Sequence, residues 1–149
     1  MAETSIEERI ETALTAPYAS VIRGNAREWS STNSTTLSTN KFNLTRVIER
    51  ALPDAPSIDV NVNCIVVNGS LDKGEEPHYH DSYVIGIIQR GHGRFTVKRD
   101  GKVIDEQVSR GDIVIIPKGT YHVFDGTDIL YAAFEFGKEG EVNYQRHQH

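Results

Sequence analysis

The sequence predicts an all-β fold, a sandwich or barrel of short strands preceded by short helices. From Ile58 onward the hydrophobic pattern changes to a period of two, which is typical of β-strands. Short apolar runs then follow one another, with turn residues roughly every eight to twelve positions, the spacing of sandwiches and barrels. Within this region Asp100-Gly101 separates two runs and is a strong hairpin signal.

The N-terminal third has helical spacing instead. Residues 4–15 predict a short amphipathic helix that Pro17 ends, with one apolar stripe formed by Ile6, Ile10 and Leu14. Residues 44–52 again have helical spacing. Between these helices, residues 24–40 are polar and predict a loop. Trp29 is interpreted as the buried anchor of this loop, with the lining of a substrate pocket as the alternative.

The predicted strands carry three further expectations. The alternation of Val60, Val62, Cys64 and Val66 predicts a buried face, on which Cys64 is a small structural hydrophobe rather than a nucleophile. Gly91-His92-Gly93 is interpreted as a turn that ends the run Tyr83–Arg90, with His92 in solvent. Residues 122–124 and 129–136 are expected to be two separate strands.

At 149 residues, one domain is the expectation. We expect the barrel to span residues 58–137. A helical and loop extension, residues 1–57, would pack on the barrel or on a partner subunit, and residues 138–149 form a polar tail.

Composition narrows the class of function. A net charge of −5 provides no basic footprint for nucleic acid and no polybasic patch for a membrane, and no apolar run has the length of a membrane span. Cys64, the single cysteine, excludes an internal disulfide and fits a reducing compartment. We therefore expect a cytoplasmic protein without a nucleic-acid or membrane partner.

Three histidines form the candidate site. His78 and His80 are two positions apart, so on a strand both imidazoles point to one face. Joined by His122 from a later strand, they can form a metal site with open coordination positions. The alternative for the His-x-His pair is two ordinary surface histidines on an edge strand.

Two motifs resemble those of the cupin superfamily. The first runs from Gly74 to His80 and continues to Gly91, and the second runs from Gly111 through Pro117-Lys118-Gly119 to His122. The resemblance implies a double-stranded β-helix, or jelly-roll barrel, in which His78, His80 and His122 bind one divalent metal. Fe(II) is favoured, with Ni, Cu, Zn or Mn as alternatives. Because cupins are commonly dimers, the resemblance also implies a homodimer, with a small-molecule substrate as the other partner.

This chain departs from the cupin pattern at three positions. Val84 stands where the family usually has a fourth, glutamate ligand, Asp72 stands at the first glycine position, and Gly126 replaces a closing asparagine. The resemblance therefore implies three histidine ligands without the usual glutamate. A second, shorter resemblance, over residues 80–95, is to the sensing barrel of AraC-type transcription regulators.

The function expected from these motifs is a metal-dependent enzyme that acts on a small anionic or chelating metabolite. A non-haem dioxygenase is favoured because three histidine ligands leave positions for substrate and O2. The alternatives are a redox-neutral lyase, isomerase or cyclase, and a non-catalytic small-molecule binding module. Tyr83 and Tyr121 adjoin the ligand strands and are candidate catalytic hydrogen-bond donors, with core or rim packing as the alternative.

Overall fold

The computed structural model describes residues 6–23, 44–70, 82–140 and 142. These residues form two helices and six strands, all of the strand pairs being antiparallel. The elements are α1 (Ile6–Leu14), β1 (Ser20–Ile22), α4 (Leu44–Ala51), β2 (Ile58–Ser70), β3 (Tyr83–Arg99), β4 (Lys102–Ser109), β5 (Ile113–Ile116) and β6 (His122–Lys138). The all-β prediction and both predicted helices are confirmed, whereas the predicted loop 24–40 lies outside the described residues. Neither described helix has the length and apolarity to cross a membrane.

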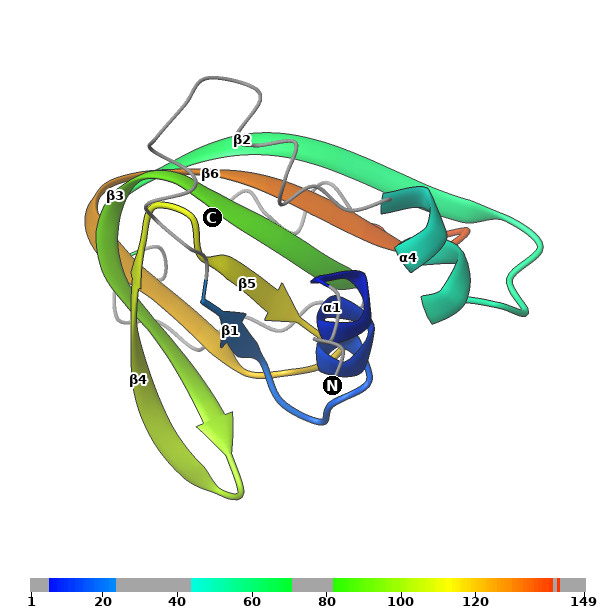
Figure 1. Cartoon of the computed structure of the whole chain (residues 1–149), viewed down its shortest axis with the longest axis horizontal. Helices are drawn as coiled ribbons and strands as arrows, with labels where there is room; N and C mark the ends of the chain where they lie inside the picture. The colour runs from blue at the N-terminus through cyan, green and yellow to red at the C-terminus, as the bar shows by residue number, and fades with distance from the viewer. Residues whose placement is uncertain (1–5, 24–43, 71–81, 141, 143–149) are drawn as a thin grey trace, which may run out of the picture.

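The strands form one sheet in the order β1-β5-β3-β6-β2, and β4 pairs with β3 outside this path (Figure 1). The predicted hairpin joins β3 to β4, with Asp100 and Gly101 both at positive φ as its turn requires. The sequence reasoning missed β1, a three-residue strand in the N-terminal extension that pairs with β5. Two parts of the chain far apart in sequence therefore share this edge of the sheet.

Strands β3 and β6 are each continuous, so the predicted turn at Gly91-His92-Gly93 and the predicted division of β6 are wrong. The β3–β6 register shifts on either side of Arg90, and Gly91 has a φ of 85°. These features mark a bulge, which bends a strand without ending it. Figure 1 shows β2, β3 and β6 curling together at one side of the molecule.

The bend in β3 and β6 brings the backbones of these two strands unusually close together. A Cβ placed on Gly93 would lie 2.3 Å from the backbone oxygen of Asp125, and one on Gly126 would lie 3.0 Å from the backbone oxygen of His92 and 2.1 Å from the side-chain Cδ1 of Ile129. Gly93 and Gly126 pair with each other across the two strands. Glycine at both positions lets the strands curl so tightly that their two halves form the two walls of one interior.

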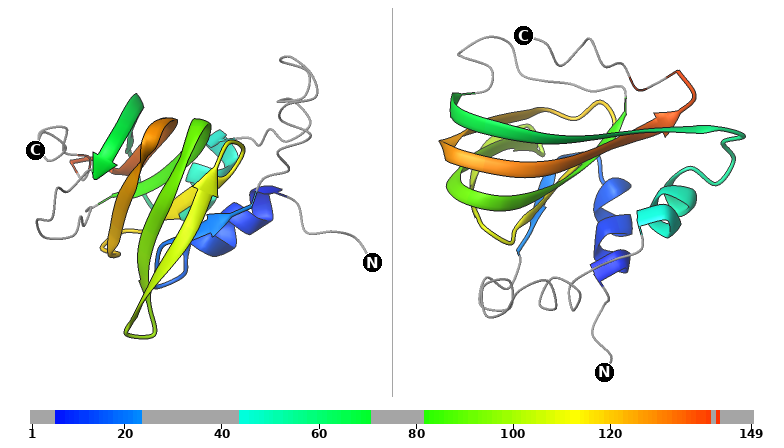
Figure 2. Two further views of the ribbon diagram at one scale, coloured as in Figure 1. Left: turned by 90° about the vertical axis from the view of Figure 1, so that its left-hand side faces the viewer. Right: turned by 90° about the horizontal axis from the view of Figure 1, so that it is seen from above.

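Two hydrophobic clusters lie on opposite faces of the sheet. The inner core fills the concave side and includes Val84, Phe95, Val97, Ile116, Phe124 and Tyr131. The helix-side core lies between the other face and α1 and α4, and includes Ile10, Leu14, Val47, Ile85, Ile115 and Phe136. Figure 2 shows both helices on this second face, where ion pairs of Arg46 with Glu7 and of Arg50 with Glu11 connect α4 to α1.

The face of β2 that was predicted to be buried is exposed in the structure. Val60, Val62, Cys64 and Val66 are exposed, whereas Val67 is buried and Ile65 packs partly against the inner core. Periodicity separates the two faces of a strand but does not say which face meets the core. The buried-face prediction for Cys64 was therefore wrong, and the polar residues Asn61 and Asn63 share the face of Val67 instead.

Candidate metal centre

His122 is the one predicted metal ligand within the described residues; His78 and His80 lie outside them. It begins β6, is 4% exposed and pairs with Val97 of the inner core. Paired residues on antiparallel strands project to the same face, so the imidazole enters the interior. Its ring lies against Phe95, with 6.2 Å between the ring centroids.

The backbone around His122 sets its tautomer. The Thr120 amide and hydroxyl both donate to the Pro117 carbonyl oxygen, which closes the turn that follows β5. The Thr120 carbonyl oxygen is then 3.2 Å from Nδ1 of His122. Because a carbonyl oxygen can only accept, the proton belongs on Nδ1 and the lone pair on Nε2. Metal-binding histidines use this arrangement, so His122 fits a divalent cation site.

Val84, which occupies the usual glutamate position of the first motif, also faces the interior. It is 5% exposed and belongs to the inner core. Val84 pairs with Ile116 of β5 on one side and with Glu135 of β6 on the other. Residue 84 therefore lies inside the barrel, in the wall opposite the strand segment that holds His122.

Glu135 is a functional candidate that the sequence reasoning missed. Its residue is 5% exposed, and it shares the inner face with Val84 because the two are directly paired. The hydroxyl of Ser82, itself fully buried, donates a hydrogen bond to Oε2 of Glu135. One signal was available in the sequence, since Glu135 is the acidic residue within the otherwise apolar run 129–136.

A row of four paired residues crosses the inner face. Asn61 of β2 pairs with Glu135, Glu135 with Val84, and Val84 with Ile116. Asn61 and Glu135 form the polar half of this row, and Val84 and Ile116 form the apolar half. The interior therefore combines hydrogen-bonding groups with an apolar wall, which is the usual composition of a small-molecule site.

Tyr131 shows how strongly part of this interior excludes water. It stacks on Phe124 at 5.1 Å between ring centroids, within the inner core. Burial raises the pKa of the Tyr131 phenol to about 12, because the charged phenolate is disfavoured there. Electrostatic interactions with any ion in this environment are correspondingly stronger than in water.

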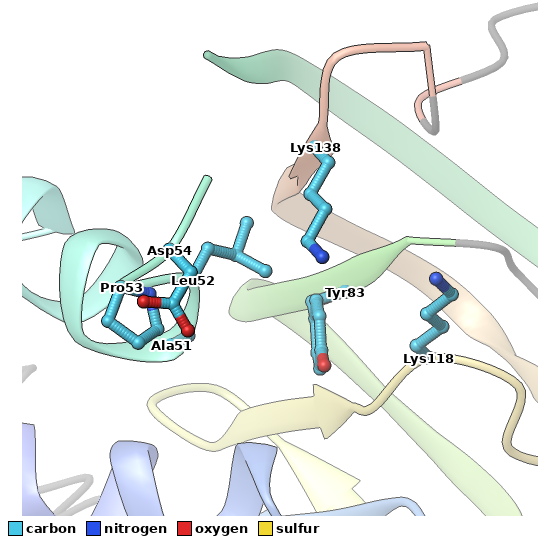
Figure 3. A pocket seen from close by; sticks show the side chains of 7 residues that line it. All are labelled: Ala51, Leu52, Pro53, Asp54, Tyr83, Lys118 and Lys138. Carbon is cyan, nitrogen blue, oxygen red and sulfur yellow. The ribbon is translucent and has the colours of Figure 1, made fainter. Parts of the chain in front are cut away.

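The two candidate tyrosines lie in different surroundings. Tyr83 pairs with Phe136 and stacks on it at 5.5 Å, which places it on the helix-side face rather than the inner face. Tyr83 lines a pocket of about 270 Å³, and Figure 3 shows it between residues 51–54 on one side and Lys118 on the other, with Lys138 above it. Tyr121 is half-buried and directly precedes His122.

Within the described ranges, no three histidine, cysteine, aspartate or glutamate side chains gather closely enough to hold a metal ion. The structure brings His122 and Glu135 into the two walls of one interior, but a centre with three histidines needs His78 and His80 as well. Their placement is a prediction that the described residues do not test.

Comparison with known proteins assigns the family. Residues 9–131 match the ARD/ARD′ family, a stretch that contains both histidine motifs. The chain is 29% identical over 77 residues to acireductone dioxygenase of Gluconacetobacter diazotrophicus, covering 52% of this chain and 43% of that protein. It is 31% identical over 81 residues to acireductone dioxygenase of Heterostelium pallidum, covering 54% of this chain and 56% of that protein. The chain thus spans about half the length of each of these two relatives.

Among solved structures, Bacillus subtilis oxalate decarboxylase overlaps with a TM-score of 0.46 at 18% identity, covering 66% of this chain and 25% of that chain. Because this TM-score is below 0.5, the assignment rests on the family match. That match covers most of the chain and agrees with the cupin motifs and with the antiparallel fold. The chain therefore belongs to the ARD/ARD′ family, within the cupin superfamily.

Proposed function

We propose that this protein is a metal-dependent dioxygenase that acts on a small anionic, chelating metabolite, with an acireductone as the first candidate substrate. The observation that carries the proposal is His122, a buried imidazole whose Nδ1 contacts the Thr120 carbonyl oxygen, so that Nε2 has the lone pair a metal requires. Relatives named acireductone dioxygenase support the choice of reaction and substrate.

His122 would hold the metal together with His78 and His80, and Fe(II) is the favoured ion, with Ni, Cu, Zn or Mn as alternatives. Bound there, the ion would supply Lewis acidity and open coordination positions. The contact of Thr120 with Nδ1 fixes the direction in which His122 presents Nε2. The ring of Phe95 packs beside the imidazole and further restricts its rotation.

Charge supports an anionic substrate. Three neutral imidazoles leave a divalent ion with its full +2 charge, which is costly in a low-dielectric interior. An acireductone is an enediol beside a carbonyl, so it ionises readily and presents neighbouring oxygens for chelation. The aromatic wall formed by Phe95, Phe124 and Tyr131 would keep water away from such an anion.

The experiment uses untagged protein in which His147 and His149, a second His-x-His pair, are both replaced by Gln to remove background metal binding. This protein is loaded anaerobically with Fe(II), its metal content is measured, and O2 uptake is followed after addition of an acireductone. We expect about one ion per chain and O2 consumption that needs both metal and substrate.

His122→Ala should reduce bound metal well below stoichiometric and abolish O2 uptake. His92→Ala is the matched control, because His92 is exposed at the bend of β3 and should retain full metal content. Metal binding by His122→Ala at the parental level would refute the proposed centre. Substrate conversion without O2 uptake would instead identify a redox-neutral enzyme.

A further inference from the structure

We propose that Glu135 provides a carboxylate ligand to the metal that His122 binds, and that Ser82 positions this carboxylate. The inference rests on the proposed function. Glu135 lies four residues beyond the end of the family match at residue 131, so that match does not assign it. Its position follows from the pairing of β6 with β2 and β3.

The first argument is burial. A carboxylate that is 5% exposed is costly to ionise unless hydrogen bonds or a nearby cation compensate for lost water. Ser82 donates one hydrogen bond, to Oε2. A carboxylate can accept at both oxygens, so this bond and coordination of a cation are compatible. Metal-ligating carboxylates are commonly held by hydrogen bonds of this kind.

The second argument is position. Directly paired residues have Cβ atoms roughly 5 Å apart, and Glu135 is directly paired with Val84. The longer glutamate side chain can therefore extend over the space beside the shorter valine. His122 enters the same interior from the other half of β6, because the bend at Gly126 folds the strand upon itself.

The third argument is the reversed polarity of β2. Asn61 pairs with Glu135 and faces inward, whereas the apolar residues Val60 and Val62 of the same strand are exposed. Simple core packing does not explain why this end of β2 turns the half-buried amide of Asn61 inward and two valines outward. This orientation is explained if the interior beside Glu135 receives a polar, charged occupant. Coordination by Glu135 would reduce the charge of a divalent centre from +2 to +1, and the remaining positive charge still favours an anionic substrate.

The test measures Co(II) binding to metal-free protein by calorimetry and by visible absorption, again in the background lacking His147 and His149. Glu135→Gln keeps the side-chain shape but removes the charge, and we expect at least a tenfold loss of affinity. Adding Val84→Glu to Glu135→Gln returns a carboxylate across the strand pair and should recover most of that loss. Asp112→Asn is the matched control, because Asp112 is another carboxylate with 5% exposure but pairs with Arg23 at the far end of β5.

The outcomes separate the two proposals. If the parental protein binds no Co(II), the proposed metal centre fails. If it binds Co(II), and Glu135→Gln binds it equally well with the same absorption spectrum, the centre stands and the role of Glu135 is overturned.

Thermal melting of the metal-free variants checks folding. Should Glu135→Gln not fold, Glu135→Asp tests the same point, because a shortened ligand shifts the Co(II) absorption bands. A spectrum of Glu135→Asp identical to that of the parental protein would overturn the inference.

Discussion

Replacing Gly93 by alanine tests whether the bend of β3 depends on backbone contact. The added Cβ would lie 2.3 Å from the Asp125 oxygen, 2.6 Å from Cα of Gly126 and 2.7 Å from Cδ1 of Ile129. Two of these three atoms belong to the backbone, so no rotamer change relieves the clash. Overpacking typically costs 1–3 kcal/mol, and the rigid partners place this substitution at about 3 kcal/mol. At 2–4 °C per kcal/mol, the melting temperature should fall by roughly 6–12 °C.

The control is Gly101→Ala in the hairpin turn. Gly101 has a φ of 77°, but a Cβ there meets no atom within 4 Å, so the cost is conformational and about 1 kcal/mol. Thermal unfolding of metal-free protein, followed by circular dichroism, compares the variants with the parental protein. The reasoning is refuted if Gly93→Ala melts within about 2 °C of the parental protein, or if it loses no more stability than Gly101→Ala. Either result would mean that the bend does not require the backbone of Gly93 to lie close to that of Asp125 and Gly126.

Three further predictions follow from burial and charge. Because the pKa of Tyr131 is about 12 in the folded protein, the unfolded protein releases the phenol proton first as the pH rises from 10 to 12. The free energy of unfolding should therefore fall by about 3 kcal/mol over this interval. In alkaline denaturation, Tyr131→Phe should lose less stability than the parental protein. Cys64 is exposed, so Ellman's reagent should label it stoichiometrically without denaturant; labelling only after unfolding would show that the outer face of β2 is covered. Metal-loaded protein should bind an acireductone with proton release and metal-free protein much more weakly, whereas equal affinities in calorimetry would mean that the substrate does not coordinate the metal.

Local patterns predicted the strands and the hairpin well. The alternation after Ile58 and the Asp100-Gly101 turn both depend on residues close in sequence, and both are observed. The Gly91-His92-Gly93 error has a physical cause, because glycine allows both a turn and a bulge. Which one forms depends on whether the chain beyond it continues to pair with the same partner strand. Here β6 pairs with β3 on both sides of the bend, information that no local window contains.

The candidate site was predictable in part. The spacing around Pro117 and Gly119 predicted His122 as a ligand; the structure places this residue in the interior, and its binding of a metal stays a prediction. Glu135 was not predicted as a site residue from the sequence. Its proposed role depends on its pairing with Val84, which lies far away in the sequence but directly beside it in the sheet. The face of β2 was assigned wrongly for a related reason. Alternation separates the two faces of β2, but the register of β2 against β6 determines which face turns inward.

The continuity of β6 connects the fold to the proposed chemistry. His122 and Glu135 belong to one strand, and the bend near Gly126 turns the two halves of that strand toward a common interior. Had β6 been two strands joined by a loop, loop motion would change the distance between the histidine and the carboxylate. A single strand paired along its length with β3 instead holds both side chains on rigid backbone, which is what a metal centre with defined geometry requires. The glycines of the bend are therefore as much a part of the proposed site as the side chains that line it, because they determine how closely its two walls approach.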